Sequence, residues 1–154
     1  MVFAGEIVES LTKMVKPKLA AGTSAEAEKM GKVIIGTVAG DIHDIGKKIV
    51  SFMLDINGFE VFDLGIDVPA QTFVDKISET EAPVVGLSGF LTLSFDSMKE
   101  TVKAIEEAGL RDKVKIMVGG GVLDESVREY VGADSFGRFA GDAVAIAKDW
   151  TGGE

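Results

Sequence analysis

The stretch "KVIIGTVAGDIHDIGKKIV" (residues 32–50) predicts one complete strand–loop–helix unit. Residues 32–38 are a run rich in β-branched side chains, which is typical of a buried strand. From residue 45 onward apolar residues recur at helical spacing, until "NG" at 57–58 indicates the end of the helix. The loop between them contains His43, the only histidine of the chain, with Asp41 and Asp44 beside it.

The same alternation of an apolar strand and an amphipathic helix recurs along the chain. Further strands are expected at 59–65, 83–89, 114–121 and 133–139, and further helices at 67–79, 95–105, 123–131 and 140–150. Apolar strands that alternate with amphipathic helices predict a parallel sheet covered on both faces. We therefore expect an α/β fold with a doubly wound, five-stranded parallel sheet in the flavodoxin-like, Rossmann-like order.

Composition limits the classes of function. A chain of 154 residues suits a single globular unit, here placed at 32–154, after a short amphipathic helix and linker at 1–31. The net charge of -9 argues against binding to nucleic acid or to an anionic membrane, because both are polyanions. The chain has no cysteine and so no disulfide or thiolate metal site. Without an apolar run of about 20 residues or a signal peptide, we expect a cytoplasmic protein.

A ligand site is expected beyond the carboxyl ends of the strands, where open parallel sheets bind their ligands. The loops expected there are 39–46, 65–69, 88–94, 119–121 and 136–141. The unusual residues of the chain fall in these loops. This coincidence is the main reason to look for the site at that edge of the sheet.

His43 is the first candidate for a functional side chain. A histidine that ligates a metal usually donates its other ring N–H to an acceptor such as a carboxylate, and Asp41 or Asp44 could serve. One histidine cannot build a zinc site, which needs three or four protein ligands. A metal already held by a macrocycle needs only one. The alternative is a surface histidine that happens to lie beside acids.

Hydroxyl groups and glycines mark two further strand ends. Ser88, Thr92 and Ser94 could contact a ligand. Thr92 or Ser94 could also cap the helix that follows, and the two roles are compatible. The run 119–121 is all glycine, which permits close approach of a ligand or simply forms a tight turn. The first loop lacks a phosphate-binding Gly/Thr pattern, which argues against FMN or a dinucleotide. The third strand lacks a terminal aspartate, which argues against a phosphorelay receiver.

Together these residues resemble the cobalamin-binding domain family, whose pattern is Asp-x-His-x-x-Gly, then Ser-x-Leu, then Gly-Gly. The matching residues are Asp41, His43 and Gly46, then Ser88 with Phe90 in place of leucine, then Gly119 and Gly120. The resemblance covers 32–150. The strings "GTVAGDIHDIGKKIV" and "DLGIDVPAQTFV" are most similar to the corrinoid proteins of methyltransferase systems. Phe90 is a departure that bears on the packing against the nucleotide tail of the cofactor.

The resemblance implies a role for each matching residue. His43 would be the lower axial ligand of cobalt, in place of the dimethylbenzimidazole of the cofactor, with Asp41 and then Ser94 extending a relay behind it. The implied cofactor-binding residues are Asp41, Ile42, His43, Asp44, Ile45, Gly46, Ser88, Phe90, Leu91, Thr92, Gly119, Gly120, Gly121, Phe136 and Gly137. Residues 1–31 would be the last helix and linker of a helical cap domain.

The resemblance also implies a function. The chain would bind cobalamin or a related corrinoid in the base-off, histidine-on form. It would carry a methyl group from a substrate-specific methyltransferase to a second methyltransferase, whose acceptor is a compound such as tetrahydrofolate or a thiol. A reductive activase is a further implied partner, and the chain would not be an autonomous enzyme. The alternatives are the cobalamin domain of an adenosylcobalamin-dependent mutase, a cobalamin-based sensor, and a scaffold domain that binds no corrinoid.

Overall fold

The computed structural model describes residues 31–120, 124–137 and 140–151. Strands and helices alternate through this part of the chain, as the sequence predicts. The strands are β1 (Gly31–Thr37), β2 (Phe59–Asp63), β3 (Val84–Ser88), β4 (Lys115–Gly119) and β5 (Ser135–Gly137). The helices are α2 (Ile45–Ile56), α3 (Ala70–Thr80), α4 (Thr92–Glu107), α5 (Glu125–Val131) and α6 (Ala140–Thr151), with a short 3-10 helix (Arg111–Lys113) before β4. The helix expected near the N-terminus lies outside the described residues.

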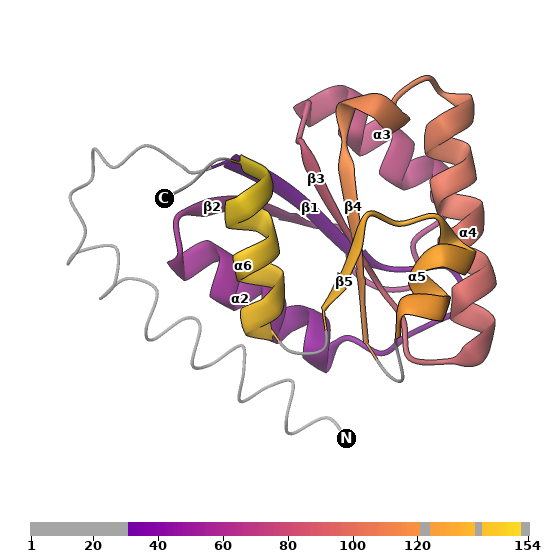
Figure 1. Ribbon diagram of the computed structural model, residues 1–154, viewed down its shortest axis with the longest axis horizontal. Coiled ribbons are helices and arrows are strands. Elements are labelled where there is room, and N and C mark those ends of the chain that lie inside the picture. The colour runs from indigo at the N-terminus through magenta and orange to yellow at the C-terminus, as the bar shows by residue number, and fades with distance from the viewer. Residues whose placement is uncertain (1–30, 121–123, 138–139, 152–154) are drawn as a thin grey trace.

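The five strands form one parallel sheet in the order β2-β1-β3-β4-β5. This is the flavodoxin-like order, so the predicted fold class is confirmed. Helices α2 and α6 cover one face of the sheet, and α3, α4 and α5 cover the other (Figure 1). The strand order reverses between β1 and β3, which makes their carboxyl ends the switch point of the fold.

Both faces of the sheet are buried, which explains why the strands are continuously apolar rather than alternating. One core cluster includes Ile34 and Val85 and packs against Phe73 of α3 and Met98 of α4. The cluster on the other face includes Val33, Val84, Leu54 of α2 and Ala147 of α6. The neighbouring β1 residues Val33 and Ile34 thus pack into core clusters on opposite faces of the sheet.

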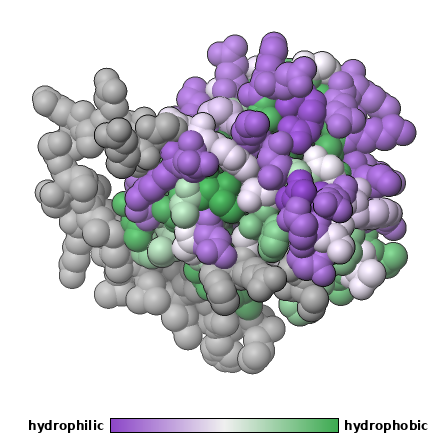
Figure 2. Space-filling view, viewed as in Figure 1, coloured by the Kyte–Doolittle hydropathy of each residue, from purple (hydrophilic) through white to green (hydrophobic). Residues whose placement is uncertain are grey.

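The strand ends are level across the sheet, and this places the candidate site. In the pairing register, Thr37 of β1 lies beside Ser88 of β3, Ser88 beside Gly119 of β4, and Gly119 beside Gly137 of β5. The loops that follow these four residues therefore leave the sheet along one edge. Hydrophilic side chains crowd the opposite end, where α4 finishes (Figure 2). Within the described part of the chain, no helix has the length and apolar character needed to cross a membrane.

One prediction about a helix start is wrong. Helix α4 begins at Thr92 with Leu91 at its N-cap, and no side chain caps it. Thr92 and Ser94 therefore lie inside the first turn, and neither caps the helix as the sequence had suggested. Ser94 faces a different partner, described below.

Candidate functional site

Asp41 is the centre of the site and lies in the loop after β1, completely buried. Its Oδ1 accepts hydrogen bonds from the backbone N–H of His43 at 2.9 Å and contacts His43 Nδ1 at 2.6 Å. Its Oδ2 accepts from the hydroxyl of Ser94 at 2.5 Å and from the backbone N–H groups of Phe90 and Leu91 at 2.6 and 3.2 Å. This carboxylate therefore joins the loop after β1 to the loop after β3 across the switch point.

These hydrogen bonds determine the charge of Asp41. Burial alone would raise the pKa of its carboxyl group, but the hydrogen bonds from Ser94, from the backbone of His43 and Phe90, and from the His43 ring lower that pKa well below its usual range. Asp41 is thus an ionised, acceptor-only carboxylate at neutral pH.

The ionised carboxylate determines the tautomer of His43. Because Asp41 can only accept, His43 Nδ1 carries a proton and donates it, so that in the neutral imidazole Nε2 is the nitrogen with the lone pair. The side chain of His43 is 49% exposed. Asp44, the other acid considered as a partner, instead forms an ion pair with Lys48 at 3.3 Å. The site therefore presents one oriented and partly exposed imidazole nitrogen, as a metal ligand requires.

Phe90 supports the imidazole from the side. Its ring centroid lies 4.7 Å from that of His43, with the two planes tilted by 33°. Phe90 itself is nevertheless 57% exposed. Other large exposed apolar residues lie in the same loops, in the first turns of α2 and α4 and after β2: Ile42, Ile45, Ile66, Leu91 and Leu93. An apolar surface around an available ligand nitrogen suits a large, partly apolar cofactor.

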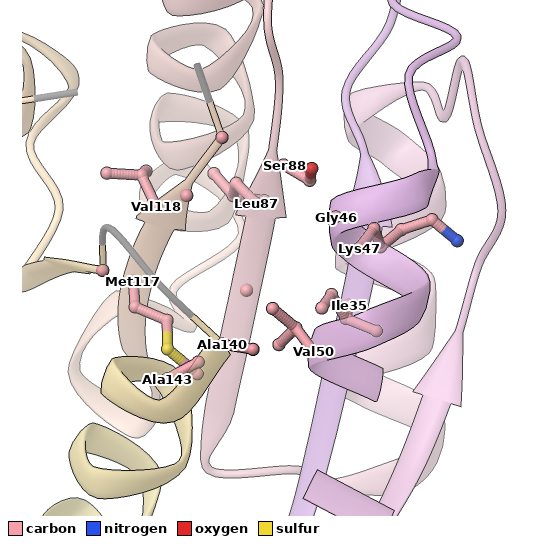
Figure 3. Close-up of a pocket in the computed structure, with 14 residues that line it drawn as sticks. Ile35, Gly46, Lys47, Val50, Leu87, Ser88, Met117, Val118, Ala140 and Ala143 are labelled. Carbon is pink, nitrogen blue, oxygen red and sulfur yellow. The ribbon is translucent and has the colours of Figure 1, made fainter. Parts of the chain in front are cut away.

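A pocket opens beside these loops, between the carboxyl ends of β1, β3 and β4 and the helices α2 and α6 (Figure 3). The predicted site residues that line it are Gly46, Ser88, Gly119, Gly120 and Gly137. Its cavity volume is about 140 Å³, which is less than the roughly 300–1,000 Å³ of pockets for drug-sized ligands. Only part of a large cofactor would fit inside it.

Several residues that line the pocket were not among the predicted site residues. They are Ile35, Lys47, Val50, Gly86, Leu87, Met117, Val118, Ala140 and Ala143. Lys47 contributes only its aliphatic part, because its ammonium points away from the pocket toward Asp63, 2.6 Å away (Figure 3). A glycine in the middle of a buried strand, Gly86, and the small residues Ala140 and Ala143 at helical spacing were the available sequence signals.

Glycine occurs in the lining of the pocket for two different structural reasons. A Cβ on Gly46 would meet nothing within 4 Å, and one on Gly119 would lie 3.7 Å from the carbonyl oxygen of Gly137. Gly120 differs, because its φ is +110° and a Cβ there would lie 2.2 Å from the carbonyl oxygen of Gly89. A side chain is therefore excluded at Gly120 by the backbone of a tight turn. At Gly46 and Gly119 the absence of a side chain leaves open space in the pocket.

The remaining predicted site residues have other positions. Thr92 is exposed at the start of α4, and Phe136 packs against the core cluster on the side of α4 and α5. Gly121 lies outside the described residues. The structure therefore brings together Asp41, His43 and Ser94 at one point. Ser88 and the predicted glycines that the structure describes line an adjacent pocket.

These residues fit a metal that brings its own ring of ligands. Among the described residues, no group of three or more His, Cys, Asp or Glu side chains is arranged to hold a bare metal ion. A corrinoid needs one axial ligand from the protein, an apolar surface for its ring and a narrow slot for a displaced substituent. His43, the exposed apolar residues and the glycine-lined pocket would provide these three features.

Comparison with known proteins agrees with this geometry. Residues 31–147 match the model of the B12 binding domain family. A dimethylamine corrinoid protein of Methanosarcina mazei is 40% identical over 149 residues, which are 97% of this chain and 68% of that protein. A cobalamin-binding protein of Desulfitobacterium hafniense has a TM-score of 0.77 and 46% identity, over 97% of this chain and 68% of that one. The methanol:cobalamin methyltransferase complex MtaBC of Methanosarcina barkeri has a TM-score of 0.77 and 29% identity, over 87% of this chain and 51% of the matched one.

Proposed function

The chain belongs to the B12-binding domain family, and on that premise we propose that it is a corrinoid protein that carries a methyl group between two methyltransferases. The cofactor is cobalamin or a related corrinoid. The similarity to a dimethylamine corrinoid protein and to a component of a methanol:cobalamin methyltransferase complex supports a methyl-carrying role. The first methyltransferase would be specific for the methyl donor, and the second would use an acceptor such as tetrahydrofolate or a thiol. A reductive activase completes the proposed set of partners.

The observation that carries this proposal is the Asp41–His43 pair. The Nδ1 proton of His43 is held by the buried carboxylate, so Nε2 is the nitrogen that would bind cobalt. A bound corrinoid would supply the cobalt chemistry for this proposed methyl transfer. Asp41 makes the imidazole a stronger ligand, and Ser94 stabilises the charge of Asp41 by its hydrogen bond. With the corrinoid bound, this arrangement would give the base-off, histidine-on form that we propose.

The pocket is the proposed slot for the nucleotide tail of the cofactor. Once His43 replaces the tail's base as the axial ligand, that base needs a new place. The pocket adjoins the loop that carries Asp41, because Gly46 lies two residues into helix α2 and Ser88 ends β3. Its apolar strands and its glycines without side chains suit a flat heterocycle. Residues 1–31 remain assigned, as a proposal, to the last helix and linker of a helical cap.

The histidine ligation can be tested directly because His43 is the only histidine of the chain. Untagged protein is labelled with nitrogen-15 histidine, loaded with hydroxocobalamin and reduced to the cob(II) state. Electron paramagnetic resonance then reports the nitrogen bound to cobalt. We expect the label to change the nitrogen splitting, and His43→Ala to abolish the labelled coupling. A nitrogen splitting that is the same with and without the label would refute histidine ligation.

The carrier role needs a separate measurement. Methyl-loaded protein is incubated with candidate second methyltransferases, and methylated acceptor is quantified. Transfer that requires this chain and fails with His43→Ala is expected. A deoxyadenosyl ligand retained by the purified protein, with no methyl transfer, would favour the mutase alternative instead.

A further inference from the structure

We infer that Thr37 and Asp67 are positioning residues that hold the loop 38–43 so that His43 is oriented before the corrinoid arrives. This inference rests on the proposed function of His43. Neither residue lines the pocket or was singled out from the sequence. Each makes a hydrogen bond from its side chain to the backbone of the histidine loop.

Thr37 fixes the carbonyl end of His43. It is the last residue of β1 and is fully buried, and its hydroxyl donates to the backbone carbonyl of His43 at 2.8 Å. Its own backbone is bonded on both sides, since its N–H donates to the carbonyl of Gly65 and its carbonyl accepts from Val68, each at 2.9 Å. The hydroxyl is therefore a rigid anchor. With Asp41 on the N–H and the ring, His43 is held at three separate atoms.

Asp67 fixes the beginning of the same loop from the β2–α3 connection. Its Oδ1 accepts from the backbone N–H of Gly40 at 2.7 Å, and its own N–H donates to the backbone carbonyl of Asp41 at 2.9 Å. Asp67 does this with φ at +48°, a left-handed conformation that is uncommon for a residue with a side chain. Such conformations persist where the surroundings impose them, and they gather at functional sites.

The two anchors come from different parts of the fold. Thr37 belongs to β1 and Asp67 to the next connection, while Asp41 reaches the start of α4. Loss of either anchor leaves the contact between Asp41 and the imidazole ring intact but frees the backbone that carries both residues. A ligand that is less well oriented loses more conformational entropy on binding, so the corrinoid should bind more weakly.

Four variants distinguish loss of the hydrogen bond that positions the loop from other effects of changing the side chain. Thr37→Val removes the hydroxyl and keeps the branched shape, whereas Thr37→Ser keeps the hydroxyl. Asp67→Gly removes the acceptor and adopts a positive φ without strain, whereas Asp67→Asn keeps an acceptor oxygen. The matched control is Thr101→Val, because Thr101 is also buried and also donates to a backbone carbonyl, that of Ser97 at 2.8 Å, within α4.

Two measurements read the position of His43. The first is the affinity for hydroxocobalamin, together with the labelled-histidine coupling of the cob(II) form at saturation. We expect Thr37→Val and Asp67→Gly to weaken binding by about 10-fold or more and to lower the histidine-ligated fraction. Thr37→Ser and Asp67→Asn should stay within a few-fold of wild type. Thr101→Val should lower the melting temperature and leave the coupling unchanged.

The second measurement needs no cofactor. Amide hydrogen exchange of the unloaded chain should be faster at Gly40 in Asp67→Gly and at His43 in Thr37→Val. Wild-type affinity, coupling and exchange in both variants would overturn the inference. If wild type itself shows no labelled coupling, the proposed function fails, and the exchange rates alone then decide whether the two residues position the loop. If Thr37→Val does not fold, Asp67→Gly and Asp67→Asn decide the question.

Discussion

Replacing Gly46 with leucine should close the pocket to the nucleotide tail without damaging the fold. Gly46 is the second residue of α2, lines the pocket and has open space where a Cβ would be built. Replacing a helical glycine with alanine stabilises a protein by about 0.4–1 kcal/mol where the side chain fits without strain. Leucine should therefore not lower the free energy of unfolding, although its side chain would take space that the proposed position of the tail requires.

The size of the binding effect follows from the cavity volume. A cavity in a protein interior costs about 24 cal/mol per Å³, so filling about 140 Å³ with part of a ligand gains at most about 3 kcal/mol. This is roughly a 150-fold change in Kd. Because the pocket opens to solvent, we expect Gly46→Leu to weaken cobalamin binding by about 10- to 100-fold.

The assay compares cobalamin with cobinamide, which lacks the nucleotide tail. Cobalamin binding to Gly46→Leu should weaken as calculated, whereas cobinamide binding should change little. The matched control is Gly141→Leu, because Gly141 is likewise the second residue of its helix, α6, and also has open space for a Cβ, but it does not line the pocket. Equal losses for the two corrinoids in Gly46→Leu, or no loss for either, would refute the reasoning about the pocket.

Three other predictions concern stability, and each is read from denaturant unfolding of the cofactor-free chain. Gly120→Ala should lower the free energy of unfolding by about 3 kcal/mol, since its Cβ would collide with the carbonyl of Gly89; an unchanged midpoint would contradict this. The lowered pKa of Asp41 should contribute stability that is fully present above about pH 4 and is lost as the pH falls through the folded-state pKa, a loss that Asp41→Asn should lack. Asp63→Ala should lower the free energy of unfolding by about 2 kcal/mol because it leaves the buried Lys47 unpaired. Lys47→Met should stay within about 1 kcal/mol of wild type, because it removes the buried charge together with the pair. A larger loss in Lys47→Met than in Asp63→Ala would show that the unpaired charge does not determine the loss of stability.

The sequence was sufficient for those parts of the site that depend on strand ends. Apolar runs and helical spacing located all five strand–helix units, and parallel strands must bring their carboxyl ends to one edge. The placement of Asp41, His43 and Ser88 at that edge follows from this rule. The relay through Ser94 came from the family resemblance, and the hydrogen bond to Asp41 agrees with it.

Other parts could not be predicted because they depend on contacts across the fold. The sequence pattern leaves Thr92 or Ser94 as a possible helix cap, since a hydroxyl residue just before a helix commonly serves that purpose. The cap is not what Ser94 provides. Its actual acceptor is 53 positions earlier in the chain, and only the adjacency of β1 and β3 brings the two together. Thr37 looked like one more β-branched strand residue. The left-handed backbone of Asp67 has no sequence signal as clear as a glycine.

The separation of Asp41 from its partners along the chain also bears on how the protein is made. Three of its hydrogen bonds join it to Phe90, Leu91 and Ser94, which lie 49, 50 and 53 positions later. During synthesis, the histidine loop therefore leaves the ribosome well before the residues that donate hydrogen bonds to its buried carboxylate. Such non-local pairings form slowly, because the entropy of closing a long loop is lost before the contact forms and stabilises the chain. A nascent chain that ends after β2 holds His43 and Asp41 but lacks the three donors to Asp41 Oδ2, so we expect the loop to reach its final arrangement only once β3 and the first turn of α4 have docked.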